Sequence, residues 1–120
     1  MNIGLALSGG GVKGATHIGV LQALEENEVK ISTISGTSIG SIVASLYAMG
    51  YTTDEMLKLF KYFAKTILKT DPKYLISNIR TKRSIFGEGI ISGQAIEDAI
   101  NECAKLKNIK FIKDIIMPIA

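Results

Sequence analysis

The sequence predicts an α/β protein with a three-layer α/β/α architecture and a mostly parallel sheet. Two observations predict it: short apolar segments alternate with helix-like segments, and glycine-rich turns follow the first two apolar segments. Such alternation is typical of parallel strands joined by helices that cover the sheet. With 47% hydrophobic and 21% charged residues among 120, the chain has the composition of at most one globular domain.

The first half of the chain predicts two strand–helix pairs. Residues 3–8 form a short apolar segment closed by glycines, and residues 31–35 are rich in β-branched and hydroxyl side chains, so both are predicted strands. Residues 15–27 have an apolar face at helical spacing, and residues 39–49 are apolar or small almost all round. Both are predicted helices, the second of them buried. Gly50 is suited to end that helix in the left-handed conformation.

The second half of the chain predicts mainly helices. Thr52 and Glu55 have the spacing of a capping box, so a third helix is expected to begin there and to run to about Leu68. The pair Asp71-Pro72 then breaks the helical pattern. The remaining expectations are a short helix over 73–79, a loop over 82–93, a helix capped by Ser92 or Gly93 that ends near Leu106, and the start of a third strand over 115–120.

The apolar end of the chain bears on domain organisation. Three strands are few for this architecture, and no helix follows the last of them to cover it. We therefore expect residues 1–120 to be the N-terminal part of a single domain whose remainder lies beyond residue 120. The alternative is a complete small domain with an apolar tail.

Two glycine-framed motifs carry the chemistry. Gly36-Thr37-Ser38-Ile39-Gly40 has the G-x-S-x-G pattern of a nucleophile elbow and lies between a predicted strand and a predicted helix. Its glycines permit a sharp turn that would present the Ser38 hydroxyl at the positive end of the helix dipole. A tight packing turn is the structural alternative for this motif.

The second motif is the run Gly9, Gly10 and Gly11, called here the glycine loop, which follows the first predicted strand. Glycines let the backbone approach a substrate closely and aim N–H groups at the oxyanion that forms when an ester is attacked. In a parallel sheet both motifs would lie at the carboxyl ends of their strands, where such sheets build their sites. Together they predict an acyl hydrolase.

These residues resemble the patatin-like phospholipases. The segment from Leu7 to Gly14, the following His17-Ile18-Gly19-Val20-Leu21 and the G-x-S-x-G motif are similar to that family's first two sequence blocks, and the similarity is strong over residues 3–50. The resemblance implies hydrolysis of phospholipids or other ester lipids by a Ser–Asp dyad, with Ser38 as nucleophile. It further implies an oxyanion hole in the glycine loop, supported by Lys13, Gly14, Gly36 and Gly40, and it implies no cofactor.

One part of the family pattern is absent from the chain. The family's aspartate lies in an Asp-Gly-Gly or Asp-Gly-Ala motif, and no Asp-Gly occurs in this sequence. Lys13 stands where the family usually has arginine, which keeps the charge but loses the planar fork. We expect the catalytic aspartate to lie beyond Ala120, and the 120-residue chain to be nearly inactive by itself.

The single histidine and the single cysteine are predicted to be structural. His17 has no placed acid to complete a triad, so a packing or hydrogen-bonding role is expected. Cys103 lies on an apolar helical face and is expected to be a small buried side chain. No set of residues indicates a metal site.

A basic stretch suggests a contact with membranes. Eight basic residues and one acid lie between Lys58 and Arg83, and four of the lysines have helical spacing: Lys58, Lys61, Lys65 and Lys69. A basic amphipathic helix can lie on an anionic membrane surface, although a solvated face over a core-packing face gives the same pattern. We expect a cytoplasmic protein with peripheral membrane contact and no nucleic-acid partner.

Two alternatives remain open for the function. A lipid-binding or interaction domain could keep the fold without catalysis. A nucleotide-binding module of the Rossmann type would use Gly9-x-Gly11-x-x-Gly14, but its usual acid near the end of the second strand is replaced here by Ser35-Gly36.

Overall fold

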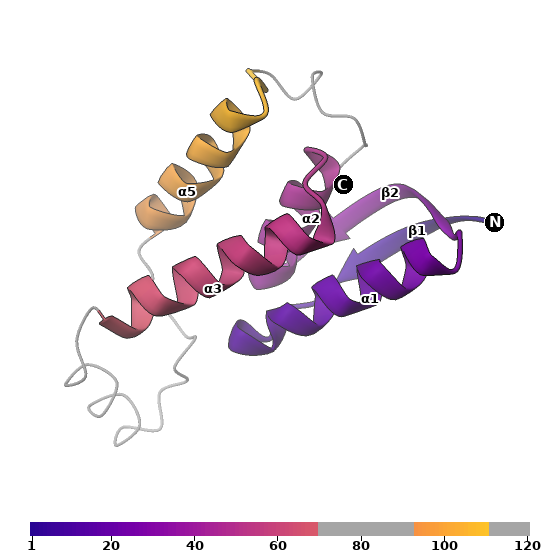
Figure 1. Ribbon diagram of the computed structural model, residues 1–120, viewed down its shortest axis with the longest axis horizontal. Helices are drawn as coiled ribbons and strands as arrows, with labels where there is room; N and C mark the ends of the chain where they lie inside the picture. Colours follow the sequence, from indigo (N-terminus) through magenta and orange to yellow (C-terminus); the bar gives the residue numbers. More distant parts are fainter. Residues whose placement is uncertain (70–92, 111–120) are drawn as a thin grey trace.

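The computed structural model describes residues 1–69 and 93–110, with two strands and the helices that follow them (Figure 1). Strand β1 is followed in the chain by η1 and α1, and strand β2 is followed by α2, α3 and α5. The element bounds are β1 Asn2–Leu7, the 3₁₀ turn η1 Gly11–Gly14, α1 Ala15–Glu26, β2 Lys30–Gly36, α2 Ile39–Ala48, α3 Thr53–Lys69 and α5 Gly93–Leu106.

The sheet pairs β1 with β2 in parallel, and its register contains one irregularity. Ile3 lies opposite Ile31, but Gly4 lies opposite Thr33, so Ser32 is an extra residue in β2. The Ser32 hydroxyl donates a hydrogen bond to the carbonyl of Ile3 at 3.0 Å, which satisfies a main-chain group beside this bulge. Beyond the bulge the pairing is regular as far as Leu7 and Gly36.

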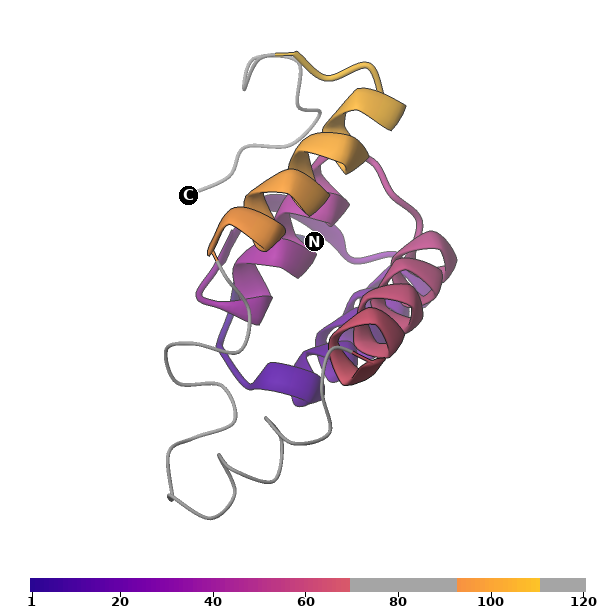
Figure 2. The ribbon, with the colours of Figure 1, turned by 90° about the vertical axis from the view of Figure 1, so that its left-hand side faces the viewer.

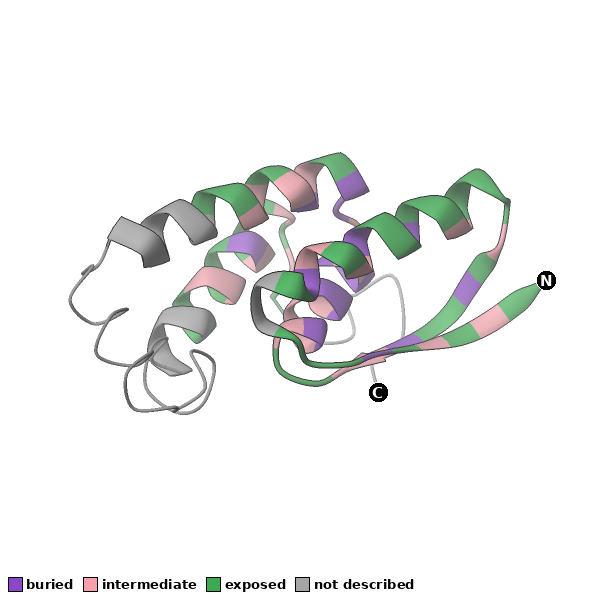
Figure 3. Cartoon of the chain, turned by 90° about the horizontal axis from the view of Figure 1, so that it is seen from below, coloured by how far each residue is buried: buried purple, intermediate pink, exposed green. Residues whose placement is uncertain are grey.

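The described helices cover one face of the sheet (Figure 3). In β1 the side chains alternate between exposed and at least partly buried, and Leu7 is buried in the core. Ile18 and Leu21 of α1 and Val43 of α2 are fully buried in the same core. The opposite face of this sheet is exposed in the part of the chain that the structure describes, and the predicted further layer is not among these residues.

The outer helices pack on the inner helices in pairs (Figure 2). Helix α3 packs against α1, and α5 packs against α2. Met56 of α3 and Cys103 of α5 complete the core, since they are 0% and 4% exposed. The expected structural role of Cys103 is thereby confirmed, and burial raises the pKa of its thiol.

Three helices end in the same main-chain arrangement. After α2, the N–H of Gly50 donates to the carbonyl of Tyr47 and the N–H of Tyr51 donates to that of Leu46, while Gly50 has a φ of 89°. This pair of bonds around a left-handed residue is a Schellman motif, and the predicted left-handed conformation of Gly50 is confirmed. Helices α1 and α5 end in the same way, with the left-handed positions held by Glu28 at φ 57° and Asn108 at φ 56°.

The capping box before α3 is present as predicted. The Glu55 carboxylate accepts the N–H of Thr52 at 2.9 Å, and the Thr52 hydroxyl accepts the N–H of Glu55 at 3.2 Å. The bond from the Thr52 backbone is the main reason why the pKa of Glu55 lies below its ordinary value. Nζ of Lys107, the residue directly after α5, lies 3.4 Å from Oε2 of Glu55, so this box also contacts the turn that ends α5.

Within residues 1–69 and 93–110, the predicted strands and helices agree with the structure to within one or two residues at their ends. Residues 73–79, 82–92 and 115–120, for which a helix, a loop and a third strand were expected, lie outside the described residues. The parallel sheet with covering helices is therefore confirmed for the first two strands.

Candidate active site

The two glycine-framed motifs meet at one edge of the sheet. Strand β1 ends at Leu7, one residue before the glycine loop begins, and β2 ends at Gly36, one residue before the turn reaches Ser38. Leu7 lies opposite Gly36 in the sheet, and the N–H of Thr37 donates to the Leu7 carbonyl at 2.9 Å. The parallel register thus brings together two motifs that are separated by more than twenty residues in the sequence.

Ser38 has a backbone conformation that is rare for a residue with a side chain. Its φ is 54° and its ψ is −126°. Ser38 occupies the first central position of a tight turn over 37–40, in which the N–H of Gly40 donates to the carbonyl of Thr37 at 3.0 Å. These dihedral angles are those of a type II′ turn, whose first central position favours glycine. The exposed serine is therefore held in a strained turn at the start of α2.

A second serine holds the turn in place. The N–H and the hydroxyl of Ser41 both donate to the Ser38 carbonyl, at 2.9 and 2.6 Å. This role of Ser41 was not predicted. A serine three residues into a helix commonly bonds a preceding main-chain carbonyl, so its position was an available signal.

Three glycines allow the close packing around Ser38. A Cβ atom on Gly40 would clash with the carbonyl oxygens of Leu7 and Ser8, and a Cβ on Gly36 would clash with the backbone of Gly40 and Ser41. A Cβ on Gly14 would clash with the side chain of Ile39. Side chains at these positions would force the strand ends and the start of α2 apart.

The glycine loop lies beside the serine. A Cβ atom placed on Gly9 would be 3.5 Å from Cβ of Ser38, which is ordinary contact distance. Among the described residues, the N–H groups of Gly9, Gly10 and Ile39 have no hydrogen-bond acceptor. Free main-chain donors next to an exposed hydroxyl are the groups that an oxyanion hole requires.

The 3₁₀ turn η1 and the first turn of α1 hold the two ends of this loop. At the far end, the N–H of Lys13 donates to the Gly10 carbonyl at 3.1 Å, and the Thr16 hydroxyl donates to the Lys13 carbonyl at 2.6 Å. At the near end, Nε2 of His17 lies 2.8 Å from the carbonyl oxygen of Ser8. His17 has the hydrogen-bonding role that was expected, and Lys13 is exposed beside the loop.

Neither Ser38 nor His17 has a carboxylate partner within residues 1–69 and 93–110. The Ser38 hydroxyl makes no hydrogen bond there, and the recorded partner of the His17 ring is a main-chain carbonyl. The described part of the chain therefore places an exposed serine hydroxyl beside main-chain donors, without a carboxylate next to the hydroxyl.

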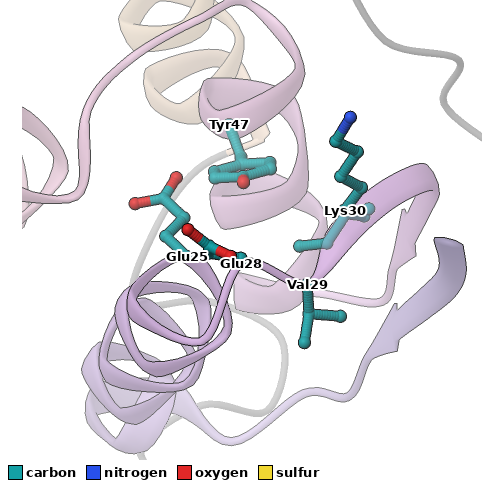
Figure 4. Close-up of a pocket in the computed structure, with 6 residues that line it drawn as sticks. Glu25, Glu28, Val29, Lys30 and Tyr47 are labelled. Atoms are coloured by element: carbon teal, nitrogen blue, oxygen red, sulfur yellow. The ribbon is translucent and has the colours of Figure 1, made fainter. Parts of the chain in front are cut away.

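A separate open hollow of about 670 Å³ lies at the other end of β2 (Figure 4). Burial, followed by the neighbouring Glu25, raises the pKa of Tyr47 in its wall to about 12, so Tyr47 is protonated at neutral pH. The hollow is distant from Ser38 in the fold, because it lies at the start of β2, whereas Ser38 follows the end of β2. The lining residues are Glu25, Glu28, Val29, Lys30, Ile31 and Tyr47.

The predicted basic face is partly visible on α3. Lys58 and Lys61 are exposed, as is Tyr62 at 66%, while the side chains of Lys65 and Lys69 lie outside the described set. Within the described residues, no helix combines the length and the apolar character that crossing a membrane requires.

Comparisons with known proteins identify the family. The family model described as "Patatin-like phospholipase" matches residues 5–117 of the chain. The lysophospholipase NTE1 of Meyerozyma guilliermondii is 42% identical over 84 residues, which cover 66% of this chain and 6% of that protein. The lysophospholipase NTE1 of Saccharomyces cerevisiae is 48% identical over 65 residues, which cover 54% of this chain and 4% of that protein.

A similar match is found with the lysophospholipase NTE1 of Candida glabrata, which is 51% identical over 65 residues, 54% of this chain and 4% of that protein. The chain thus spans a small fraction of the length of these relatives. No solved structure matches the chain. Since the family model covers nearly the whole chain, the chain belongs to the patatin-like phospholipase family.

Proposed function

We propose that this chain carries the nucleophile and the oxyanion donors of a lipid acyl hydrolase. The observation that carries the proposal is the strained turn of Ser38, with φ 54° and ψ −126°, directly beside Gly9, whose N–H has no acceptor among the described residues. A turn whose only purpose is tight packing would be relieved of strain by glycine at this position. A serine with an exposed hydroxyl at this strained position supports a role in attack on a substrate.

The proposed reaction has two steps. The Ser38 hydroxyl oxygen attacks the ester carbonyl carbon, a base accepts its proton, and the resulting oxyanion is stabilised by N–H groups of the glycine loop. The ester C–O bond breaks as the leaving alcohol takes up a proton, which leaves an acyl group on Ser38. Water then attacks this acyl-enzyme and releases the fatty acid, which regenerates the serine.

The base is expected from outside the chain. By family resemblance it is an aspartate that forms a dyad with Ser38, and the Asp-Gly motif that would hold it does not occur in residues 1–120. The dipole at the start of α2 favours negative charge near Ser38 and so supports both the attacking oxygen and the oxyanion. We therefore expect little hydrolysis from the 120-residue chain alone.

The proposed substrate is a phospholipid or another ester lipid. The printed name of the relatives, lysophospholipase, supports a glycerophospholipid with one acyl chain as the first substrate to test. We also propose that the protein works in the cytoplasm at a membrane surface, with the basic face of α3 toward anionic headgroups. Lys58 and Lys61 are the described members of that face.

A non-catalytic lipid-binding domain is the second candidate. The observation that favours it is the absence of a carboxylate at Ser38 within the described residues. The two candidates differ in what Ser38→Ala changes, because only the hydrolase needs the hydroxyl.

The experiment is covalent labelling of the full natural protein with a fluorophosphonate, together with hydrolysis of lysophosphatidylcholine. We expect one adduct and turnover in the wild type, and neither in Ser38→Ala. Ser45→Ala is the matched control, because Ser45 lies on the same helix two turns further on and should leave both unchanged. Liposome binding that survives Ser38→Ala in a protein without turnover would instead support the lipid-binding candidate.

A further inference from the structure

The orientation of one peptide plane connects His17 to the proposed oxyanion hole. The plane contains the carbonyl of Ser8 and the N–H of Gly9, and the chain has no cis peptide bond among its described residues. In a trans peptide the carbonyl and the N–H point in opposite directions. A contact that fixes the carbonyl of Ser8 therefore also fixes the direction of the Gly9 N–H.

The contact that fixes this carbonyl is made by His17. Nε2 of His17 lies 2.8 Å from the Ser8 oxygen, and within the described residues no other group donates to that oxygen. A carbonyl oxygen only accepts hydrogen bonds, so Nε2 must carry a hydrogen. This nitrogen is consequently a donor and is not available as a base for Ser38.

A contact that fixes the Ser8 carbonyl also restricts the backbone at the start of the glycine loop. Its three consecutive glycines have no side chains to restrict their backbone, so each can adopt many conformations. The start of α2 touches the same place, since Gly40 packs against the carbonyl oxygen of Ser8. His17 and Gly40 thus confine this carbonyl from the α1 and α2 sides, close to where Gly9 faces Ser38.

We propose that His17 is a positioning residue that orients the Gly9 N–H toward the oxyanion through its hydrogen bond to Ser8. The proposal rests on the proposed hydrolase function. Its effect is expected on the transition state, because only there does full negative charge develop on the substrate oxygen. Substrate binding in the ground state should change little.

The test compares three variants in the full natural protein. His17→Ala should lower kcat by about ten- to one hundredfold with nearly unchanged KM, since small misplacements of catalytic donors have effects of this size. His17→Gln places an amide donor near the position of Nε2 and should restore most of kcat. Gln22→Ala, an exposed change on the same helix, is the control and should leave kcat unchanged.

The outcomes separate this inference from the proposed function. Normal hydrolysis by Ser38→Ala would overturn the proposed function and the role of His17 with it. Loss of hydrolysis in Ser38→Ala with unchanged kcat in His17→Ala would overturn only the role of His17. Equal loss in His17→Ala and His17→Gln, or the disappearance of one limb of the pH–rate profile in His17→Gln, would show that the ring acts in another way.

A second measurement does not depend on activity. The 120-residue chain contains one histidine, so nitrogen NMR of its ring reports His17 alone. We expect hydrogen on Nε2 in the neutral ring, and we expect the amide resonance of Gly9 to shift in His17→Ala more than in Gln22→Ala. A neutral ring with hydrogen only on Nδ1 would have nothing to donate to Ser8 and would overturn the inference.

Discussion

At the scale of single residues, Ser38 shows a conflict between stability and function. Its left-handed backbone is unfavourable for any residue with a Cβ atom, yet the hydroxyl is needed if the serine is a nucleophile. The bonds from Ser41 to the Ser38 carbonyl and from Gly40 to Thr37 hold this conformation. The strain is therefore offset by neighbouring main-chain hydrogen bonds.

Replacement of Ser38 by glycine should stabilise the chain while removing the proposed nucleophile. We expect Ser38→Gly to raise the free energy of unfolding by about 1 kcal/mol, because glycine adopts positive φ without steric conflict. Ser38→Ala keeps the Cβ atom and should change this free energy by less than about half as much. Urea denaturation of the three proteins measures the difference, and equal stability of the two variants would show that the turn is not strained.

At the scale of elements, the three Schellman motifs allow a comparison of the residues that hold them. The same pair of main-chain bonds closes α1, α2 and α5, with glutamate, glycine and asparagine at the left-handed position. Glutamate is the least suited of these residues to positive φ, because only glycine and, to a lesser degree, asparagine adopt it readily. At the end of α1, Glu28 thus has a positive φ that its side chain disfavours.

This disagreement predicts opposite effects of two substitutions. Glu28→Gly should stabilise the chain by about 1 kcal/mol, and Gly50→Ala should destabilise it by about 1 kcal/mol, because each changes the steric conflict at positive φ. Ala23→Gly, in the interior of α1, is the control for added flexibility and should destabilise by about 1 kcal/mol. Thermal unfolding of the three variants tests the pattern, which a loss of stability in Glu28→Gly would contradict.

At the scale of the whole molecule, two tyrosines join elements that are distant in the sequence. Tyr47 of α2 lies beside Glu25 of α1, and the Tyr51 hydroxyl donates to the carbonyl of Cys103 in α5 at 2.7 Å. Burial raises the pKa of each tyrosine to about 12, with Glu25 adding to the effect at Tyr47, and Cys103 and Glu55 adding to it at Tyr51. Lys107 lies 4.6 Å from the centre of the Tyr51 ring.

These raised pKa values predict alkaline sensitivity. In the unfolded chain the tyrosines lose their protons near pH 10, whereas in the folded chain they keep them to about pH 12. The unfolded state therefore binds fewer protons than the folded state between these pH values. The contribution of the two tyrosines to the free energy of unfolding should be fully present below pH 10 and should fall as the pH rises toward 12. Urea midpoints between pH 8 and pH 12 measure this decline.

Tyr51→Phe should weaken the pH dependence, whereas Gln22→Ala, an exposed change that removes no titratable group, should leave it unchanged. At neutral pH we expect Tyr51→Phe to destabilise by only about 0.5–1.5 kcal/mol, because the Cys103 carbonyl still accepts the N–H of Lys107. A urea midpoint that stays constant from pH 8 to pH 12 would contradict the raised pKa values of the two tyrosines.

Much of this molecule could be predicted from its sequence because its signals are local. The capping box of Thr52 and Glu55, the left-handed Gly50 and the apolar periodicity each depend on a few adjacent residues, and the structure contains all three. The bond from His17 to Ser8 and the bulge at Ser32 could not be predicted, because each depends on which backbone groups the fold leaves without a partner. The base for Ser38 stays a prediction.

The interlocking glycines around Ser38 have a consequence for sequence drift. Ser38 is placed almost entirely by main-chain groups: strand pairing, the turn over 37–40 and close contacts at Gly14, Gly36 and Gly40. Main-chain contacts do not depend on the identity of most side chains. Exposed residues can therefore be substituted without moving Ser38, whereas Gly14, Gly36 and Gly40 are constrained by their close contacts. We therefore expect substitutions at Gly14, Gly36 and Gly40 to disturb this site far more than substitutions at exposed positions of the covering helices.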